Sequence, residues 1–349
     1  MNIFENYLNL IIKSVEKNKK KLGIKKTNNF EGVISESPPP NYDYDLSTNI
    51  ALILGKKNNL NPKDLCNNIK ELLIKEIKDF LKIDVAGPGF LNIKLTNDTL
   101  KKIILNIFKE NSKYGSSNQK HSYNIEFVSA NPTGPMHVGH CRGAIFGDVL
   151  ANLLSFNGNK VTKEYYINDY GNQIINFTKS VFLRIREIKF KESFVNHKDL
   201  YPGQYIIDIA KEIIKENPDI KFKNFNNSYE MLSKKALDHS MRLIKDDLNK
   251  LGIKHDFFFS EKDLVKKKLV EKSIEILKKN KFVVEGYLKP PKGEESKDWK
   301  KIKRLIFKSS IFGDDSDRAL QKNDGSWTYF ANDVAYHSDK ISRKYNYLI

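Results

Sequence analysis

The spacing of apolar residues divides the chain into helical and extended stretches. Apolar positions three or four residues apart predict helices at residues 3–20, 62–80, 97–110, 139–156 and from Gly171 onward. Short β-rich runs after glycine or polar turns predict strands at residues 90–95, 123–128 and 160–167. The order strand, helix, strand between residues 123 and 167 predicts a parallel βαβ unit.

Breaks in this pattern indicate the domain organisation. The proline-rich stretch Ser37–Asp45 interrupts the first helices, and the polar stretch Asn111–Ser122 has the composition of a linker. We therefore predict a small α+β domain at residues 1–112 and an α/β domain with a parallel sheet at 113–349. Lysine-rich amphipathic stretches at about 180–285 predict a largely helical insertion.

The last part of the chain returns to a strand-like pattern. Residues 273–290 have a hairpin-like sequence, and Leu348-Ile349 has the pattern of the start of another buried strand. We therefore expect the chain to be incomplete at its C-terminal end.

Charge and cysteine content narrow the function classes. Lys and Arg number 60 against 43 Asp and Glu, giving a net charge of +17. This excess favours a polyanion such as RNA or DNA, although a lysine-rich composition with solvated side chains remains the alternative. The two cysteines, Cys66 and Cys141, indicate neither a disulfide framework nor a zinc site. Without a signal peptide or an apolar run of membrane-spanning length, we expect a soluble cytoplasmic protein.

Two histidines three residues apart, His137 and His140, follow the predicted strand and a turn framed by Pro132 and Pro135. Metal ligation, phosphate binding and simple packing are all possible for such a pair. A zinc site would need further ligands, and neither Cys-x-x-Cys nor His-Glu-x-x-His occurs, so we predict no metal site. A loop between a parallel strand and a helix N-terminus is a favoured place for phosphate, and Gly139 would let a flat base approach the backbone. A nucleotide site is therefore the preferred interpretation.

Several stretches in the same order resemble one enzyme family. SANPTGPMHVGH at Ser129–His140 resembles the HIGH signature of class I aminoacyl-tRNA synthetases in its arginyl form. The helix after it (Cys141–Leu154), the strand and turn EYYINDYGNQI (Glu164–Ile174) and the stretch Phe312–Lys340 resemble the same family. Tyr44–Leu54 and Val85–Leu95 resemble its N-terminal additional domain, whereas 180–285 matches by position alone.

The resemblance implies a Rossmann-like catalytic domain that uses ATP and Mg²⁺ to convert L-arginine to arginyl-adenylate and transfers arginine to tRNA(Arg). It implies that His137 and His140 stabilise charge on the reacting phosphate. The residues that it assigns to ATP are Pro132, Thr133, Gly134, Pro135, His137, Gly139 and His140. Those that it assigns to arginine are Glu126, Ser129, Ala130, Asn131, His140, Tyr329 and Asp333. Asn49 matches a position that contacts tRNA, and Asn168, Asp169, Gly171 and Gln173 form a turn that could line the cleft or be a simple helix cap.

Arginine recognition also has a physical rationale. A guanidinium group is a planar fork of donors that suits a carboxylate, so a basic protein must place acidic groups locally. Tyr329 and Asp333 are four residues apart, a spacing that puts both on one face of a helix. The alternative is an aromatic plug beside a solvated surface acid.

The sequence also departs from the family pattern. The KMSKS-type loop, the helical domain that grips the anticodon, and a glutamine that completes the amino-acid pocket would all lie past residue 349. We therefore expect weak binding of ATP and arginine, little aminoacylation, and a monomer. The alternatives are a noncatalytic tRNA-binding remnant and another HIGH-motif nucleotidylyltransferase.

Overall fold

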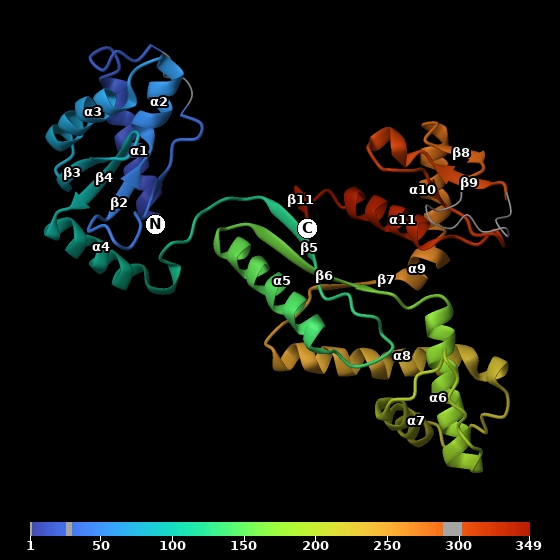
Figure 1. Cartoon of the computed structure of the whole chain (residues 1–349). Coiled ribbons are helices and arrows are strands. Elements are labelled where there is room, and N and C mark those ends of the chain that lie inside the picture. The colour runs from blue at the N-terminus through green and yellow to red at the C-terminus, as the bar shows by residue number, and fades with distance from the viewer. Residues whose placement is uncertain (1, 26–29, 289–301) are drawn as a thin grey trace. The chain divides into compact units, whose positions relative to one another are not determined.

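The computed structural model describes residues 2–25, 30–288 and 302–349. The chain forms two compact units, Met1–Asn118 and Gln119–Ile349 (Figure 1). The division falls inside the stretch Asn111–Ser122 that has the composition of a linker.

The N-terminal unit combines an antiparallel sheet of order β1-β2-β4-β3 with four helices. Its strands are β1 (Ser35–Glu36), β2 (Leu46–Thr48), β3 (Phe80–Ala86) and β4 (Phe90–Leu95). Its helices are α1 (Ile3–Lys17), α2 (Ile50–Asn58), α3 (Pro62–Glu76) and α4 (Asn97–Glu110), followed by the short 3₁₀ turn η1 (Asn111–Lys113). The helices and the sheet share one core, in which Ile11, Leu54, Leu73 and Ile93 are fully buried.

Local signals explain most of these bounds. The Asn61 side chain accepts hydrogen bonds from the first amides of α3, and Pro62 occupies the first turn. The prediction that this helix continues to Phe80 is wrong, because the backbone becomes extended at Ile77 and Phe80 begins β3. The apolar spacing continues past the helix end because α3 and β3 bury their apolar residues in the same core.

The C-terminal unit is built on a parallel sheet of order β11-β5-β6-β7. Its strands are β5 (Ser122–Glu126), β6 (Lys160–Ile167), β7 (Phe257–Ser260) and β11 (Tyr347–Leu348). Helix α5 (Val138–Phe156) joins β5 to β6, which confirms the predicted Rossmann-like βαβ unit. Ala144 of α5 and Tyr165 of β6 are buried in its core.

A group of helices follows β6. These are α6 (Asn172–Phe190), α7 (Gln204–Glu216) and α8 (Phe225–Lys250), which share a core of their own and appear together at one side of the unit in Figure 1. Strand β7 comes next and pairs with β6, so the stretch expected to be an insertion at 180–285 contains a strand of the main sheet. Two shorter helices, α9 (Glu261–Lys266) and α10 (Leu269–Lys279), complete this stretch.

A small antiparallel sheet of order β10-β9-β8 packs with the last helix. Its strands are β8 (Val283–Gly286), β9 (Arg304–Phe307) and β10 (Arg318–Ala319), with a 3₁₀ turn η2 (Ser309–Phe312) before β10. The hairpin-like stretch 273–290 contributes β8, and its last two residues lie outside the described ranges. Helix α11 (Tyr329–Ser342) then leads to β11.

The C-terminal strand differs from its prediction in one respect. Tyr347 and Leu348 do pair with β5 in parallel. They are 47% and 38% exposed, however, so the expectation of a buried strand is wrong, and β11 is an edge strand of the described sheet. Across the described ranges, no helix is both long enough and apolar enough to span a membrane.

Candidate active site

The two histidines lie together at the N-terminus of α5. His137 is the N-cap residue, and its Nδ1 accepts a hydrogen bond from the Gly139 amide at 3.1 Å. The His137 amide in turn donates to Nδ1 of His140 at 3.3 Å, and the two rings stack with their centroids 3.7 Å apart. Because both Nδ1 atoms accept, the neutral rings carry their protons on Nε2, where each can donate to a ligand.

The chemistry of this pair suits an anion. Partial burial and the neighbouring His137 both lower the pKa of His140, so this ring stays neutral near pH 7. The positive end of the dipole of α5 favours negative charge at the same place. A Cβ at Gly139 would lie 2.9 Å from Cε1 of His137, so glycine is needed for the His137 ring to fold over the helix start.

The loop before the histidines is tied to the sheet. Val128 and Ser129 have positive φ angles of 68° and 39°, and the chain turns sharply out of β5 there. The Ser129 hydroxyl donates to Glu126 at 3.0 Å and accepts from the Tyr166 amide at 3.1 Å. The Ala130 carbonyl accepts from the buried Tyr165 hydroxyl at 2.8 Å. The structure therefore brings Glu126, Ser129 and Ala130 to the carboxyl ends of β5 and β6.

Five other residues assigned from the sequence lie along this loop, at positions 131–135. Asn131 is exposed and its side-chain oxygen accepts from Asn168 at 3.4 Å, at the carboxyl end of β6. Pro132 and Thr133 are buried, and Gly134 is half-buried. Pro135 is exposed beside the exposed His137. The loop thus leaves the protein interior between Thr133 and Pro135.

Glu126 already has donors within the protein. Its Oε2 accepts from Lys340 at 2.5 Å, while Oε1 accepts from Ser129. The Tyr336 hydroxyl lies 3.0 Å from Oε2, but it shares its single proton with Glu164, to which it is closer at 2.7 Å. Lys340 is almost fully buried, so this ion pair is well shielded from water. An arginine ligand would therefore have to use the remaining lone pair on Oε1 of Glu126.

Helix α11 carries both residues of the predicted pair, Tyr329 and Asp333, about one helical turn apart. The Tyr329 ring is exposed, and the Asp333 carboxyl reaches the surface. Partial burial raises the pKa of Asp333, and the Glu126 charge raises it further, while His337 opposes both. Asp333 therefore lies within electrostatic reach of the carboxylate at the end of β5.

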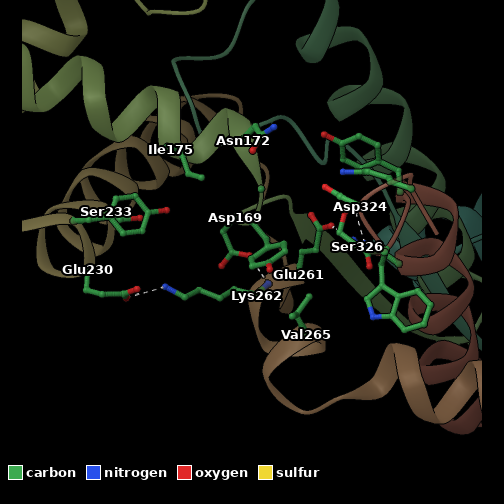
Figure 2. Close-up of a pocket in the computed structure, with 18 residues that line it drawn as sticks. Asp169, Asn172, Ile175, Glu230, Ser233, Glu261, Lys262, Val265, Asp324 and Ser326 are labelled. Atoms are coloured by element: carbon green, nitrogen blue, oxygen red, sulfur yellow. Dashed lines mark hydrogen bonds and ion pairs between the residues drawn. The ribbon is translucent and has the colours of Figure 1, made fainter. Parts of the chain in front are cut away.

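A cavity of about 510 Å³ adjoins Tyr329 (Figure 2). Figure 2 shows Asp169, Glu261 and Asp324 among its lining residues, and it marks the ion pair of Glu230 with Lys262. The aromatic residues that line the cavity are Tyr170, Tyr229, Trp327 and Tyr329. The lining has four carboxylates and two lysines, Lys262 and Lys322. This excess of acidic groups, together with the aromatic walls, suits a cationic ligand with a planar group.

Glu261 is a cavity residue that the sequence reasoning missed. It is 2% exposed, and its Oε1 accepts from Asn332 at 2.6 Å. Burial raises its pKa to about 6, and the charges of Asp169 and Asp333 add to this rise. Glu261 lies directly after β7, at its carboxyl end, and the sequence carries no signal for it because β7 itself was not predicted.

The neighbouring turn has a structural role as well. Asp169 accepts from the Ser260 hydroxyl at 2.6 Å and from the Lys262 amide at 2.8 Å, and so it holds the start of α9. Gln173 donates to the Asn168 carbonyl at 3.2 Å. Asp169 and Gly171 nevertheless line the cavity. In the described parts of the chain, no cluster of three or more His, Cys, Asp or Glu side chains has metal-binding geometry.

In the N-terminal unit, Asn49 is buried and its amide group is used internally. Its oxygen accepts from the Ile34 amide and its nitrogen donates to the Gly32 carbonyl, each at 2.9 Å. These bonds hold the chain before β1 against the start of α2. A tRNA contact by Asn49 stays a prediction.

A parallel sheet with a histidine pair in the loop after β5 is the arrangement of the class I aminoacyl-tRNA synthetase catalytic domain. Residues 103–347 match the family model described as tRNA synthetases class I (R), catalytic domain. Residues 9–95 match the model of the arginyl tRNA synthetase N terminal domain. The chain belongs to the arginyl-tRNA synthetase family.

Individual relatives give the same assignment. The chain is 50% identical over 352 residues to the arginine–tRNA ligase of Pelagibacter ubique, covering all of this chain and 61% of that protein. It is 43% identical over 355 residues to that of Wolbachia pipientis wMel, again covering 61% of the relative. The arginyl-tRNA synthetase structure from Thermus thermophilus has the same fold, with a TM-score of 0.64 at 18% identity over 96% of this chain and 53% of that one. The chain thus spans about 61% of the length of these curated relatives.

Proposed function

We propose that this chain binds L-arginine and ATP for the formation of arginyl-adenylate and the transfer of arginine to tRNA(Arg), with the weak binding and low aminoacylation that the sequence predicts. One observation carries the proposal: a paired-imidazole loop and a set of carboxylates lie at the carboxyl edge of one parallel sheet. The first suits a triphosphate and the second suits a guanidinium group. The family relationship supports the same pairing of substrates.

ATP would bind at the start of α5. His137 and His140 would donate from Nε2 to phosphate oxygens, where negative charge shifts as pyrophosphate leaves. The arginine carboxylate is itself the nucleophile, so the chain has mainly to position two substrates and stabilise charge. Mg²⁺ would be held largely by the phosphates of ATP, in accordance with its usual mode of binding to nucleotides.

Arginine would lie between the loop and α11. Its α-amino end would face Ser129 and Asn131, and its guanidinium group would face Asp333, with the ring of Tyr329 alongside. Glu261 and Glu126 would add negative potential. Because the raised pKa of Asp333 reflects unfavourable burial of its charge, a cation placed beside it would recover that cost.

The other partners follow from charge and from the family. The net charge of +17 supports binding of the tRNA backbone by counterion release. We infer a monomer that works in the cytoplasm, where tRNA charging takes place. Size-exclusion chromatography with light scattering measures the oligomeric state directly.

Ligand binding to the 349-residue chain tests the proposal. We expect titration calorimetry to detect ATP and L-arginine, with citrulline, a neutral analogue of arginine, bound at least about tenfold more weakly. Asp333→Asn should abolish the preference for arginine over citrulline. Asp315→Asn, which neutralises an exposed carboxylate in the turn between η2 and β10, is the matched control.

Two outcomes would overturn parts of this function. If neither ATP nor arginine binds while tRNA does, the chain is a noncatalytic tRNA-binding protein. If ATP binds but the chain does not discriminate arginine from citrulline, the site belongs to a different nucleotidylyl transfer. ATP–pyrophosphate exchange with each amino acid, in the presence of tRNA, would then identify the substrate.

A further inference from the structure

Two tyrosine hydroxyls hold the loop between β5 and α5 by its backbone carbonyls. Tyr165 of β6 donates to the Ala130 carbonyl at 2.8 Å, and Tyr205 donates to the Thr133 carbonyl at 2.9 Å. The first bond joins neighbours within the parallel sheet. The second comes from the first turn of α7, in the helical stretch to which the sequence assigned no function.

The Tyr205 ring also makes a close approach to the loop. A Cβ at Gly134 would lie 3.1 Å from the Tyr205 hydroxyl oxygen and 3.2 Å from Cζ, so even alanine would press on the ring. A Cβ at Gly203 would overlap the same ring from the other side. Two glycines, one in the loop and one just before α7, thus clear the space that this ring occupies.

The contact lies where the loop leaves the protein interior. Thr133 is buried and Gly134 half-buried, whereas Pro135 and His137 are exposed. After Tyr205, the next contacts along the loop are the packing of Met136 against the core and the cap of α5 formed by His137. Movement at Thr133 would therefore pass directly to the backbone that precedes the two imidazoles.

We propose that Tyr205 is a positioning residue for the nucleotide loop. Its hydroxyl fixes the position of the Thr133 carbonyl, and its ring restricts the movement of Gly134. In this way helices α6–α8 hold the loop in the shape that receives the phosphates of ATP. The inference rests on the proposed function, because it assumes that ATP binds at this loop. It gives the helical stretch a role in nucleotide binding through a contact that does not touch the ligand.

Tyr205→Phe tests the hydroxyl while keeping the ring. We expect the ATP dissociation constant of the 349-residue chain, measured by calorimetry, to rise about three- to tenfold, which is the loss of one hydrogen bond. The melting temperature should match that of Tyr201→Phe. This matched control removes a hydroxyl from the same stretch, on a ring that packs edge-on against Phe177, and it should leave ATP binding unchanged.

Gly134→Ala tests the ring contact from the opposite side. Alone it should weaken ATP binding, because the added methyl displaces the ring. In the Tyr205→Phe background the hydroxyl oxygen is already gone, so the same change should cost less. The two substitutions should therefore be non-additive in ATP affinity, as expected for groups in direct contact.

The outcomes separate this inference from the function beneath it. A wild-type chain that does not bind ATP overturns the proposed function, and the inference with it. If the wild-type chain binds ATP and Tyr205→Phe binds it equally well, the inference alone is overturned. Equal losses in Tyr205→Phe and Tyr201→Phe, or fully additive effects of the changes at positions 134 and 205, would also refute the positioning role.

Discussion

The buried carboxylate of Glu164 offers the sharpest test of the energetics. It is fully buried in β6 and accepts from both terminal nitrogens of Arg343, at 2.7 and 3.0 Å. The Tyr336 hydroxyl at 2.7 Å and the Asn124 amide complete its partners. Burial alone would raise the pKa of Glu164, but these donors outweigh burial and hold the pKa below its ordinary range.

Arg343→Met should therefore be costly. Removing one member of a buried ion pair leaves an uncompensated charge, which typically costs about 3–5 kcal/mol. Arg343 is 22% exposed, so we expect the free energy of unfolding to fall by about 3 kcal/mol, at the lower end of this range. For a unit of this size, that loss lowers the melting temperature by about 6–12 °C. Trp327 packs against a buried cluster of the unit Gln119–Ile349, so its fluorescence follows the unfolding of this unit.

Two further measurements tie the loss to the carboxylate. In the double variant Glu164→Gln/Arg343→Met the orphaned charge is absent, so at least about 1 kcal/mol should be recovered. The deficit of Arg343→Met should be largest near pH 8 and shrink toward pH 5, because the unpaired buried carboxyl then takes up a proton. Arg318→Met is the matched control, since its partner Asp314 forms a surface ion pair.

The result that would refute this reasoning is specific. A loss below about 1 kcal/mol in Arg343→Met would mean that solvent or a rearranged neighbour compensates the charge. An equal loss with Glu or Gln at position 164 would mean that the arginine acts through packing alone.

Three other predictions use the same fluorescence and calorimetric measurements. The pKa of Glu261 is raised to about 6. Above this pH its buried charge therefore lowers the free energy of unfolding by about 2 kcal/mol. Glu261→Gln should raise the melting temperature at pH 7.5 and leave it unchanged at pH 4.5. A Cβ at Gly147 would overlap the Phe127 ring, so Gly147→Ala should lower the free energy of unfolding by about 1–3 kcal/mol. The control is Gly143 on the same helix, which faces open space and should gain up to about 1 kcal/mol of stability with alanine. Equal effects of the two substitutions would contradict the packing argument. His140→Asn should weaken ATP binding about three- to tenfold. Because the pKa of His140 is lowered, the ring is neutral between pH 7 and 8, and the wild-type affinity should not change across this range through His140.

The sequence is most informative where local signals bound an element. It predicts α4 at Asn97–Glu110, where Thr96 caps the first turn, and β6 at Lys160–Ile167, with the observed ends. It misplaces the end of α3, because apolar spacing continues into β3 without a local stop signal. It does not foresee β7, because the run Phe257–Ser260 has no alternation and becomes a strand only by pairing with β6.

The same distinction holds for the candidate site. The contact between His137 and His140 is local, and the capping geometry follows from three residues of spacing. The distant partners of Glu126 and Glu164 lie on α11 or at its C-cap, more than 170 residues away in the sequence, and no periodicity identifies them. Glu261 becomes notable only once its burial and its neighbours are known.

Helix α11 connects the stability of this unit to its proposed specificity. Asp333, Tyr336, Lys340 and Arg343 occur at spacings that place them along one face of the helix. The last three bind the carboxylates of β5 and β6, and Asp333 lies about 10 Å before Lys340 along the helix axis. Because a helix is stiff over two turns, these anchors determine where Asp333 stands relative to the loop after β5. Glu126 connects the helix to the loop, because it accepts from Lys340 of α11 and from Ser129 of the loop. It is therefore better understood as a structural link than as a free acceptor for arginine. Substitution of Lys340 should accordingly weaken arginine binding. Charge alone would predict the opposite, because Lys340 carries the same sign of charge as the ligand.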